Sequence, residues 1–99
     1  MKKITRKRIE DILRAHRQEL KKRFKLKEIG IFGSFVRDEQ KKRSDIDILV
    51  EFEKAPGLLK FIETEEYLSK ILELKVDLVM KKALKPGIGK YILKEVVYI

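Results

Sequence analysis

The chain of 99 residues contains no cysteine, no tryptophan, only one histidine and only two prolines. Without cysteine it can form neither a disulfide framework nor a thiolate metal site. The single histidine, His16, also argues against a histidine-rich metal cluster or a histidine-based catalytic triad. These absences exclude cysteine-based sites and disfavour histidine-based ones.

Long apolar runs are missing as well. The chain begins with Met-Lys-Lys, as a signal peptide can, but the polar and basic residues 5–8 leave no apolar segment to follow. Apolar runs elsewhere are only a few residues long, which argues against a membrane span. The sequence therefore predicts a soluble, cytoplasmic protein. Its length predicts a single domain, residues 1–99, without a separate substrate-recognition domain.

Positive charge is abundant, with 25 lysines and arginines against 16 acidic residues and a net charge of +9. Such an excess attracts polyanions, including nucleic acids, triphosphates and acidic protein surfaces. However, a charged content of 41% is also typical of proteins from very hot environments. The aromatic residues mostly follow apolar patterns expected of a core rather than a basic stacking surface. Direct nucleic-acid binding is therefore a minor alternative.

Apolar periodicity predicts alternating helices and strands along the chain. Thr5 is suited to cap the first helix, and His16 lies on its apolar stripe as a packing residue. Leu58, Ile62 and Tyr91 are among the residues expected to face the core. The predicted elements are a helix over residues 5–22, strands over 28–32 and 44–52, a helix over 58–72, a strand over 76–80 and a final helix from residue 88. Residues 35–42 are expected to form a short helix and then a loop.

The order of these elements indicates the fold class. The third strand follows a helix, as in a crossover connection between neighbouring strands. We therefore expect an α/β or α+β sandwich, in which a small mixed sheet of about three strands has helices packed on one face.

The most informative pattern is Gly33-Ser34, followed after ten residues by Asp45-Ile46-Asp47. Residues two apart in a strand point to the same face, so Asp45 and Asp47 would present their carboxylates side by side. Two close carboxylates repel each other and are tolerated only when a cation or a proton neutralises them. Mg²⁺ suits this role, because it prefers oxygen ligands and takes one or two carboxylates from a protein.

A third acid, Asp77, lies between apolar residues in the predicted third strand. If that strand neighbours the second, Asp77 can reach the same place as Asp45 and Asp47. Three carboxylates could then hold two Mg²⁺ ions, which would clamp the attacking and leaving oxygens of a phosphoryl transfer.

The Gly33-Ser34 turn would supply the phosphate-binding half of such a site. Glycine allows a close backbone approach, a following helix would direct N–H groups toward an anion, and Ser34 adds a hydroxyl. Arg37, Lys42 and Arg43 could neutralise a triphosphate. Each feature alone is common, as a turn, a solvated strand end or surface charge. Their combination at this spacing is much less common.

At these residues the chain closely resembles the minimal nucleotidyltransferase family, within the DNA polymerase β-like nucleotidyltransferase superfamily. The stretches that carry the resemblance are residues 31–37, residues 44–50, residues 76–79 and residues 94–99. The chain departs from the family at Asp38, where members often carry glycine.

The resemblance implies a nucleotidyltransferase palm in which Asp45 and Asp47 bind Mg²⁺ and Asp77 is a third ligand or the base. It implies ATP as substrate, with Gly33, Ser34, Arg37, Arg43 and Ser44 as the nucleotide-binding positions. It also implies an antitoxin paired with a HEPN-domain ribonuclease toxin, which some members silence by transferring AMP to a tyrosine. The alternative is an antitoxin that masks its toxin sterically without catalysis, an alternative that Asp38 and the lack of a second domain leave open.

Overall fold

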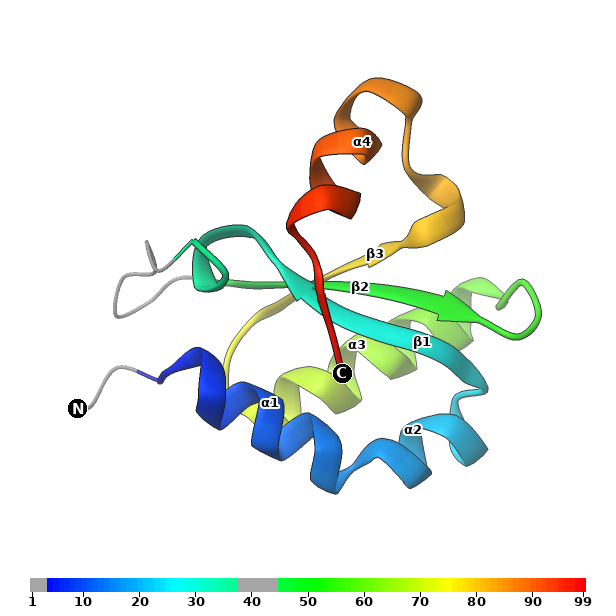
Figure 1. The fold of residues 1–99 in the computed structure, drawn as a ribbon. Helices are drawn as coiled ribbons and strands as arrows, with labels where there is room; N and C mark the ends of the chain where they lie inside the picture. Colours follow the sequence, from blue (N-terminus) through cyan, green and yellow to red (C-terminus); the bar gives the residue numbers. More distant parts are fainter. Residues whose placement is uncertain (1–3, 38–44) are drawn as a thin grey trace.

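The computed structural model describes residues 4–37 and 45–99. Four strands form one mixed sheet in the order β3-β2-β1-β4 (Figure 1). β1 is antiparallel to β2 and β4, whereas β2 and β3 are parallel. The elements are α1 (Arg6–Ala15), α2 (Arg17–Arg23), β1 (Leu26–Phe32), the 3₁₀ turn η1 (Gly33–Phe35), β2 (Ile46–Phe52), α3 (Leu58–Leu72), β3 (Val76–Met80), the 3₁₀ turn η2 (Lys81–Ala83), α4 (Pro86–Glu95) and β4 (Val97–Tyr98).

The two faces of the sheet differ. Helices α1, α2 and α3 cover one face, and α4 stands on the other (Figure 1). Because side chains alternate along a strand, Ile46, Ile48 and Val50 of β2 enter the core under the helices and are at most 1% exposed. Asp47 lies between them and points to the other face, which we call the open face. The predicted α/β class with a mixed sheet is thus confirmed, whereas the expectation that the helices pack on one face holds for α1, α2 and α3 but not for α4.

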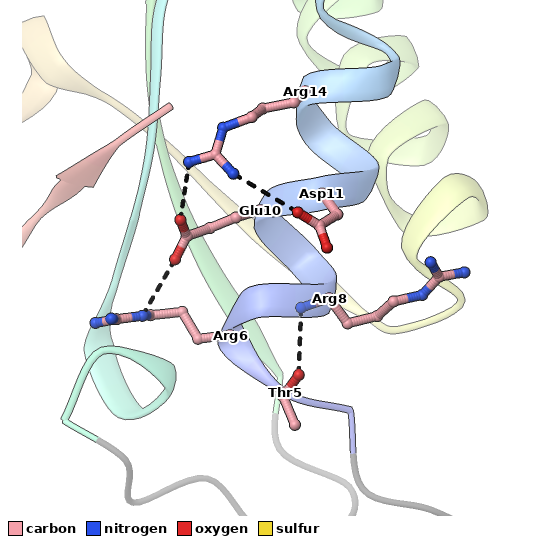
Figure 2. Close-up of polar contacts among 6 residues, drawn as sticks. All are labelled: Thr5, Arg6, Arg8, Glu10, Asp11 and Arg14. Atoms are coloured by element: carbon pink, nitrogen blue, oxygen red, sulfur yellow. Dashed lines mark hydrogen bonds and ion pairs between the residues drawn. The ribbon is translucent and has the colours of Figure 1, made fainter.

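The charged surface of α1 shows how the helix tolerates so many basic residues. The Thr5 hydroxyl caps the helix by accepting a backbone N–H of the first turn at 3.2 Å (Figure 2). Glu10 lies between two cations, 3.2 Å from Arg6 and 3.0 Å from Arg14, and Arg14 also approaches Asp11 at 3.7 Å. Each such pair stabilises a helix by about 0.2–0.5 kcal/mol. Part of the basic excess is therefore a solvated helix surface.

The predicted first helix is two helices, since the chain bends at His16 between α1 and α2. The Nδ1 atom of His16 lies 2.9 Å from the Ile12 carbonyl oxygen, and its ring meets Tyr67 edge-on at 6.0 Å. These contacts are those of the predicted packing histidine. No helix in the described part of the chain is long and apolar enough to cross a bilayer.

The C-terminal prediction needs correction. The last residues form strand β4 rather than more helix, so the sheet has four strands where about three were predicted. Three residues expected in the core are exposed: Leu58 and Tyr91 at 75% each, and Ile62 at 39%. Apolar periodicity locates the apolar side of a helix, but it does not reveal whether the sheet extends beneath that side.

Candidate active site

Two of the predicted aspartates lie side by side in neighbouring strands. Asp47 in β2 and Asp77 in β3 are register partners in the parallel pair. Residues in register on adjacent strands share a face of the sheet, so both carboxylates belong to the open face. Asp77 is exposed and Asp47 is half-buried. The sequence placed Asp77 at the site on the condition that the third strand neighbours the second. The structure meets this condition.

Asp45 lies immediately before β2, which begins at Ile46. Its carboxylate is half exposed, and its Oδ2 atom lies 4.0 Å from the Nζ atom of Lys75. Asp45 is close enough to Asp47 for its charge to affect the titration of that residue. It therefore stands at the solvent-facing edge of the acidic group.

The electrostatics of the site are concentrated on Asp47. Its pKa is raised from 3.8 to about 6, first by burial and then by the negative charges of Asp77 and Asp45. The positive charge of Arg37 lowers this pKa, while Glu95 adds a smaller upward effect. The fold therefore holds several like charges near one half-buried carboxylate, and a bound cation would relieve the repulsion.

The Gly33 turn packs directly against Asp47. Gly33 has a φ of +81°, and a Cβ atom added to it would lie 2.1 Å from the Oδ2 atom of Asp47. Only glycine suits both the backbone conformation and the space. Residues Gly33–Phe35 form a single 3₁₀ turn, which the N–H of Val36 closes on the Gly33 carbonyl at 3.0 Å. Most of the short helix predicted over residues 35–42 lies outside the described residues. Ser34 is partly exposed in this turn.

A glutamate that sequence reasoning did not single out completes the turn. Glu95, the last residue of α4, accepts the backbone N–H of Gly33 at 2.9 Å through Oε2. Its Oε1 atom pairs with the Arg37 guanidinium at 2.5 Å. In the sequence, Glu95 stands out only as part of the C-terminal stretch that resembles the family. No spacing rule connects residues 62 positions apart, so this contact could be found only in the structure.

Some of the predicted positions fall between residues 37 and 45, in the part of the chain that the structure does not describe. Arg43 and Ser44, predicted to bind the nucleotide, lie outside the described residues, as do Lys42 and Asp38. The described part of the site consists of Gly33, Ser34, Arg37, Asp45, Asp47, Asp77 and Glu95.

The donor chemistry of this group fits Mg²⁺. Carboxylate oxygens are the hard ligands that Mg²⁺ prefers, and a cation beside Asp47 would favour its ionised form against the burial and the neighbouring negative charges that raise its pKa. Within residues 4–37 and 45–99, no three histidine, cysteine or acidic side chains are arranged to hold a metal. Mg²⁺ does not require such a cage, because it takes one or two carboxylates and completes its shell with water and substrate phosphate.

Comparison with known proteins adds an independent line of evidence. The model of the nucleotidyltransferase domain family matches residues 13–99. The protein adenylyltransferase MntA of Thermococcus cleftensis is 60% identical over 99 residues, which is the full length of both chains. The chain MJ0128 of Methanocaldococcus jannaschii, provisionally named a protein adenylyltransferase, is 54% identical over 92% of this chain and 94% of its own length.

Solved structures agree with these sequence matches. A structure provisionally assigned as a minimal nucleotidyltransferase has a TM-score of 0.73 and 32% identity, and the match covers 93% of this chain and 89% of that one. A crystal structure of a toxin-antitoxin with AMP-PNP has a TM-score of 0.72 over 91% of this chain and 70% of that one. Its identity is 24%, so this second likeness concerns the fold.

Proposed function

The chain belongs to the nucleotidyltransferase domain family, among the minimal nucleotidyltransferases, and from this premise we propose that it transfers AMP from ATP to a hydroxyl group of a partner protein with Mg²⁺ as cofactor. The observation that carries the proposal is the register of Asp47 with Asp77, beside a glycine turn that packs against Asp47. The relatives from Thermococcus cleftensis and Methanocaldococcus jannaschii are both named as adenylyltransferases of protein, which supports protein as the acceptor.

We assign the acidic residues to the metal and to the attacking hydroxyl. Asp45 and Asp47 would hold Mg²⁺. Asp77 would either be a third ligand of Mg²⁺ or accept the proton of the acceptor hydroxyl. When bound, Mg²⁺ supplies positive charge that offsets the charge of the triphosphate. The half-buried position of Asp47 favours this role, because an ionised carboxylate there gains most from a neighbouring cation.

We assign the glycine turn and nearby basic residues to the triphosphate. Ser34 can donate its hydroxyl to a phosphate oxygen, Arg37 offers a guanidinium beside the turn, and Arg43 and Ser44 are proposed to add further contacts. The acceptor oxygen would form a bond to the α-phosphorus as the bond from that phosphorus to pyrophosphate breaks. The acceptor proton passes to Asp77 or to water, and pyrophosphate leaves.

The partner that we propose is a HEPN-domain toxin, with this chain as its antitoxin. The support is the family resemblance, together with the structural likeness to a toxin-antitoxin that was solved with AMP-PNP. A further observation is that α4 carries exposed apolar side chains at Ile88, Tyr91 and Leu93. These side chains belong to the helix on the open face (Figure 1), and the last residue of that helix contacts the Gly33 turn, which packs against Asp47.

Label transfer tests this proposal. The purified chain is incubated with Mg²⁺ and ATP labelled on its α-phosphate, together with the product of any neighbouring HEPN-type gene. We expect label on the partner with the wild-type chain and none with the Asp45→Asn/Asp47→Asn variant. Glu63→Gln, which neutralises an exposed acid of α3, is the matched control and should transfer as wild type.

The result also decides between catalysis and masking. The exposed apolar side chains of α4 would equally suit an antitoxin that only covers its toxin. If wild type forms a stable complex but transfers no label, masking is the better account. If the double variant loses transfer but keeps the complex, the two activities are separate properties of one chain.

A further inference from the structure

Glu95 closes a ring of contacts around the proposed triphosphate-binding turn. Its Oε2 atom accepts the N–H of Gly33 at 2.9 Å, and its Oε1 atom pairs with the Arg37 guanidinium. The Gly33 carbonyl in turn accepts the backbone N–H of Arg37 at 3.2 Å. Three residues from two distant parts of the chain are therefore joined in a closed network.

The network holds the Gly33 turn and the Arg37 side chain, the two groups on which nucleotide binding would depend. Gly33 is held at a φ of +81° and lies against the Asp47 carboxylate, so a shift of this turn would change the wall of the acidic site. The Arg37 side chain is 53% exposed and long, and such a side chain samples many rotamers unless a partner fixes it. The carboxylate of Glu95 is only 20% exposed, so it provides a comparatively fixed anchor.

The position of Glu95 has an electrostatic cost that calls for an explanation. Its carboxylate binds the turn that packs against the half-buried carboxylate of Asp47, so two negative charges are held close together. A glutamate that only ended α4 could point to solvent, where its charge would be hydrated. A carboxylate accepting two donors in the turn instead stabilises one geometry of that turn, because hydrogen bonds to charged groups are strong and directional.

We propose that Glu95 is a positioning residue, which orients the Gly33 turn and the Arg37 guanidinium for the triphosphate of the incoming nucleotide. This inference rests on the proposed function and names a residue that serves it. Glu95 acts through Gly33 and Arg37 and does not itself contact the reacting atoms. A consequence is that α4 is coupled to nucleotide binding through its last residue.

The test compares the affinities of ATP and AMP, each with Mg²⁺, for wild type, Glu95→Ala, Glu95→Gln and Glu63→Ala, measured by calorimetric titration. We expect Glu95→Ala to weaken ATP binding about tenfold, the size expected for a lost charged hydrogen bond. AMP binding should change much less, because AMP lacks the phosphates that the turn and Arg37 would hold. Glu95→Gln keeps an oxygen acceptor for Gly33, so it should recover part of the ATP affinity. Glu63→Ala removes an exposed acid elsewhere and should bind as wild type.

The outcomes separate this inference from the proposed function. ATP binding by Glu95→Ala equal to or tighter than wild type overturns the positioning role, and tighter binding would mean that Glu95 competes with phosphate for Gly33. An equal loss of ATP and AMP affinity also overturns it, since that result indicates a general structural defect. If Glu95→Ala does not fold, Glu95→Gln decides by the same ATP-to-AMP comparison. Failure of the wild-type chain to bind ATP at all overturns the proposed function and this inference together.

Discussion

The two faces of the sheet are built from the same strands but obey different physical rules. On the helix-covered face, Ile46, Ile48 and Val50 are almost completely removed from water, and their packing stabilises the fold. Asp47 lies between two of these residues in the sequence but on the open face, where it is the register partner of Asp77 in β3. The covered face thus gathers apolar groups that favour contact, whereas Asp47 and Asp77 bring charges that repel each other to one end of the open face.

The contrast shows why a chain of this size can carry an active site. A strand alternates its side chains, so every second residue can be given to chemistry without interrupting the core. The electrostatic repulsion among the acidic side chains arises on the open face, where solvent screens it in part. We therefore expect substitutions on the covered face to change stability most, and those on the open face to change stability little or even favourably.

The largest effect on stability should come from Ile48→Ala. This truncation leaves a cavity in the covered face, where Ile48 is fully buried, and should lower the free energy of unfolding by about 3 kcal/mol. Urea unfolding followed by circular dichroism measures it. Ile62→Ala, at a half-exposed position of α3, is the control and should change stability by less than about 0.5 kcal/mol. Equal effects at the two sites would contradict the burial of Ile48 in the core.

Gly33→Ala should have the next largest effect, because it affects the boundary between the two faces. The substitution combines a positive φ with a Cβ atom placed 2.1 Å from the Asp47 carboxylate. We expect a loss of about 2 kcal/mol in unfolding free energy, with weaker ATP binding as the turn moves. Gly87→Ala is the matched control, since nothing lies within 4 Å of its added Cβ atom. A Gly33→Ala protein as stable as wild type would mean that the turn is not held as described.

A smaller effect is expected from pH, through Asp47. Its pKa is 3.8 in the unfolded chain and about 6 in the folded one, so the folded state binds the proton more tightly. The resulting stabilisation is present below about pH 4 and is lost as the pH rises through 6. Because Asp47 is partly solvated, we expect only about 1 kcal/mol rather than the full value of the shift.

Urea unfolding in EDTA at pH 5 and pH 8 measures this dependence. Asp47→Asn cannot ionise, so the variant should lose this part of the pH dependence and gain about 1 kcal/mol over wild type at pH 8. Glu63→Gln should keep the wild-type profile. An unchanged profile for Asp47→Asn would show that neither burial nor the neighbouring charges disfavour the ionised form of Asp47 in the folded protein.

The smallest effect on stability is predicted for Tyr91→Ala on α4. Tyr91 is 75% exposed, so its truncation should change the unfolding free energy by less than about 0.5 kcal/mol. If α4 receives the partner, the same variant should weaken complex formation measured by calorimetry. Gly89→Ala in the same helix is the contrasting variant. Gly89 is buried, and an added Cβ atom there would lie 2.9 Å from Leu84. A large loss of stability in Tyr91→Ala would show that this side chain packs against the fold.

Much of the fold followed from local pattern. Alternation over residues 44–52 predicted both the buried isoleucines and the position of Asp47 on the opposite face, because a strand has a side-chain period of two. The predictions failed where the pattern was ambiguous about tertiary position. Tyr91 and Leu58 lie on apolar sides of helices, yet the sheet does not cover them. Strand β4 has only two residues, Val97–Tyr98, and so short a strand cannot be predicted from the sequence without knowing that β1 lies beside it.

The sequence by itself determined the fold class, the glycine turn and the aspartate pattern, because these depend on side-chain type and on spacing along a few neighbouring residues. Only the tertiary structure decided that β3 lies beside β2, which brings Asp77 to Asp47, and that α4 returns its last residue to the turn. Contacts of this kind join parts of the chain that are far apart in sequence. Their geometry depends on how the whole core packs, and no local periodicity records it.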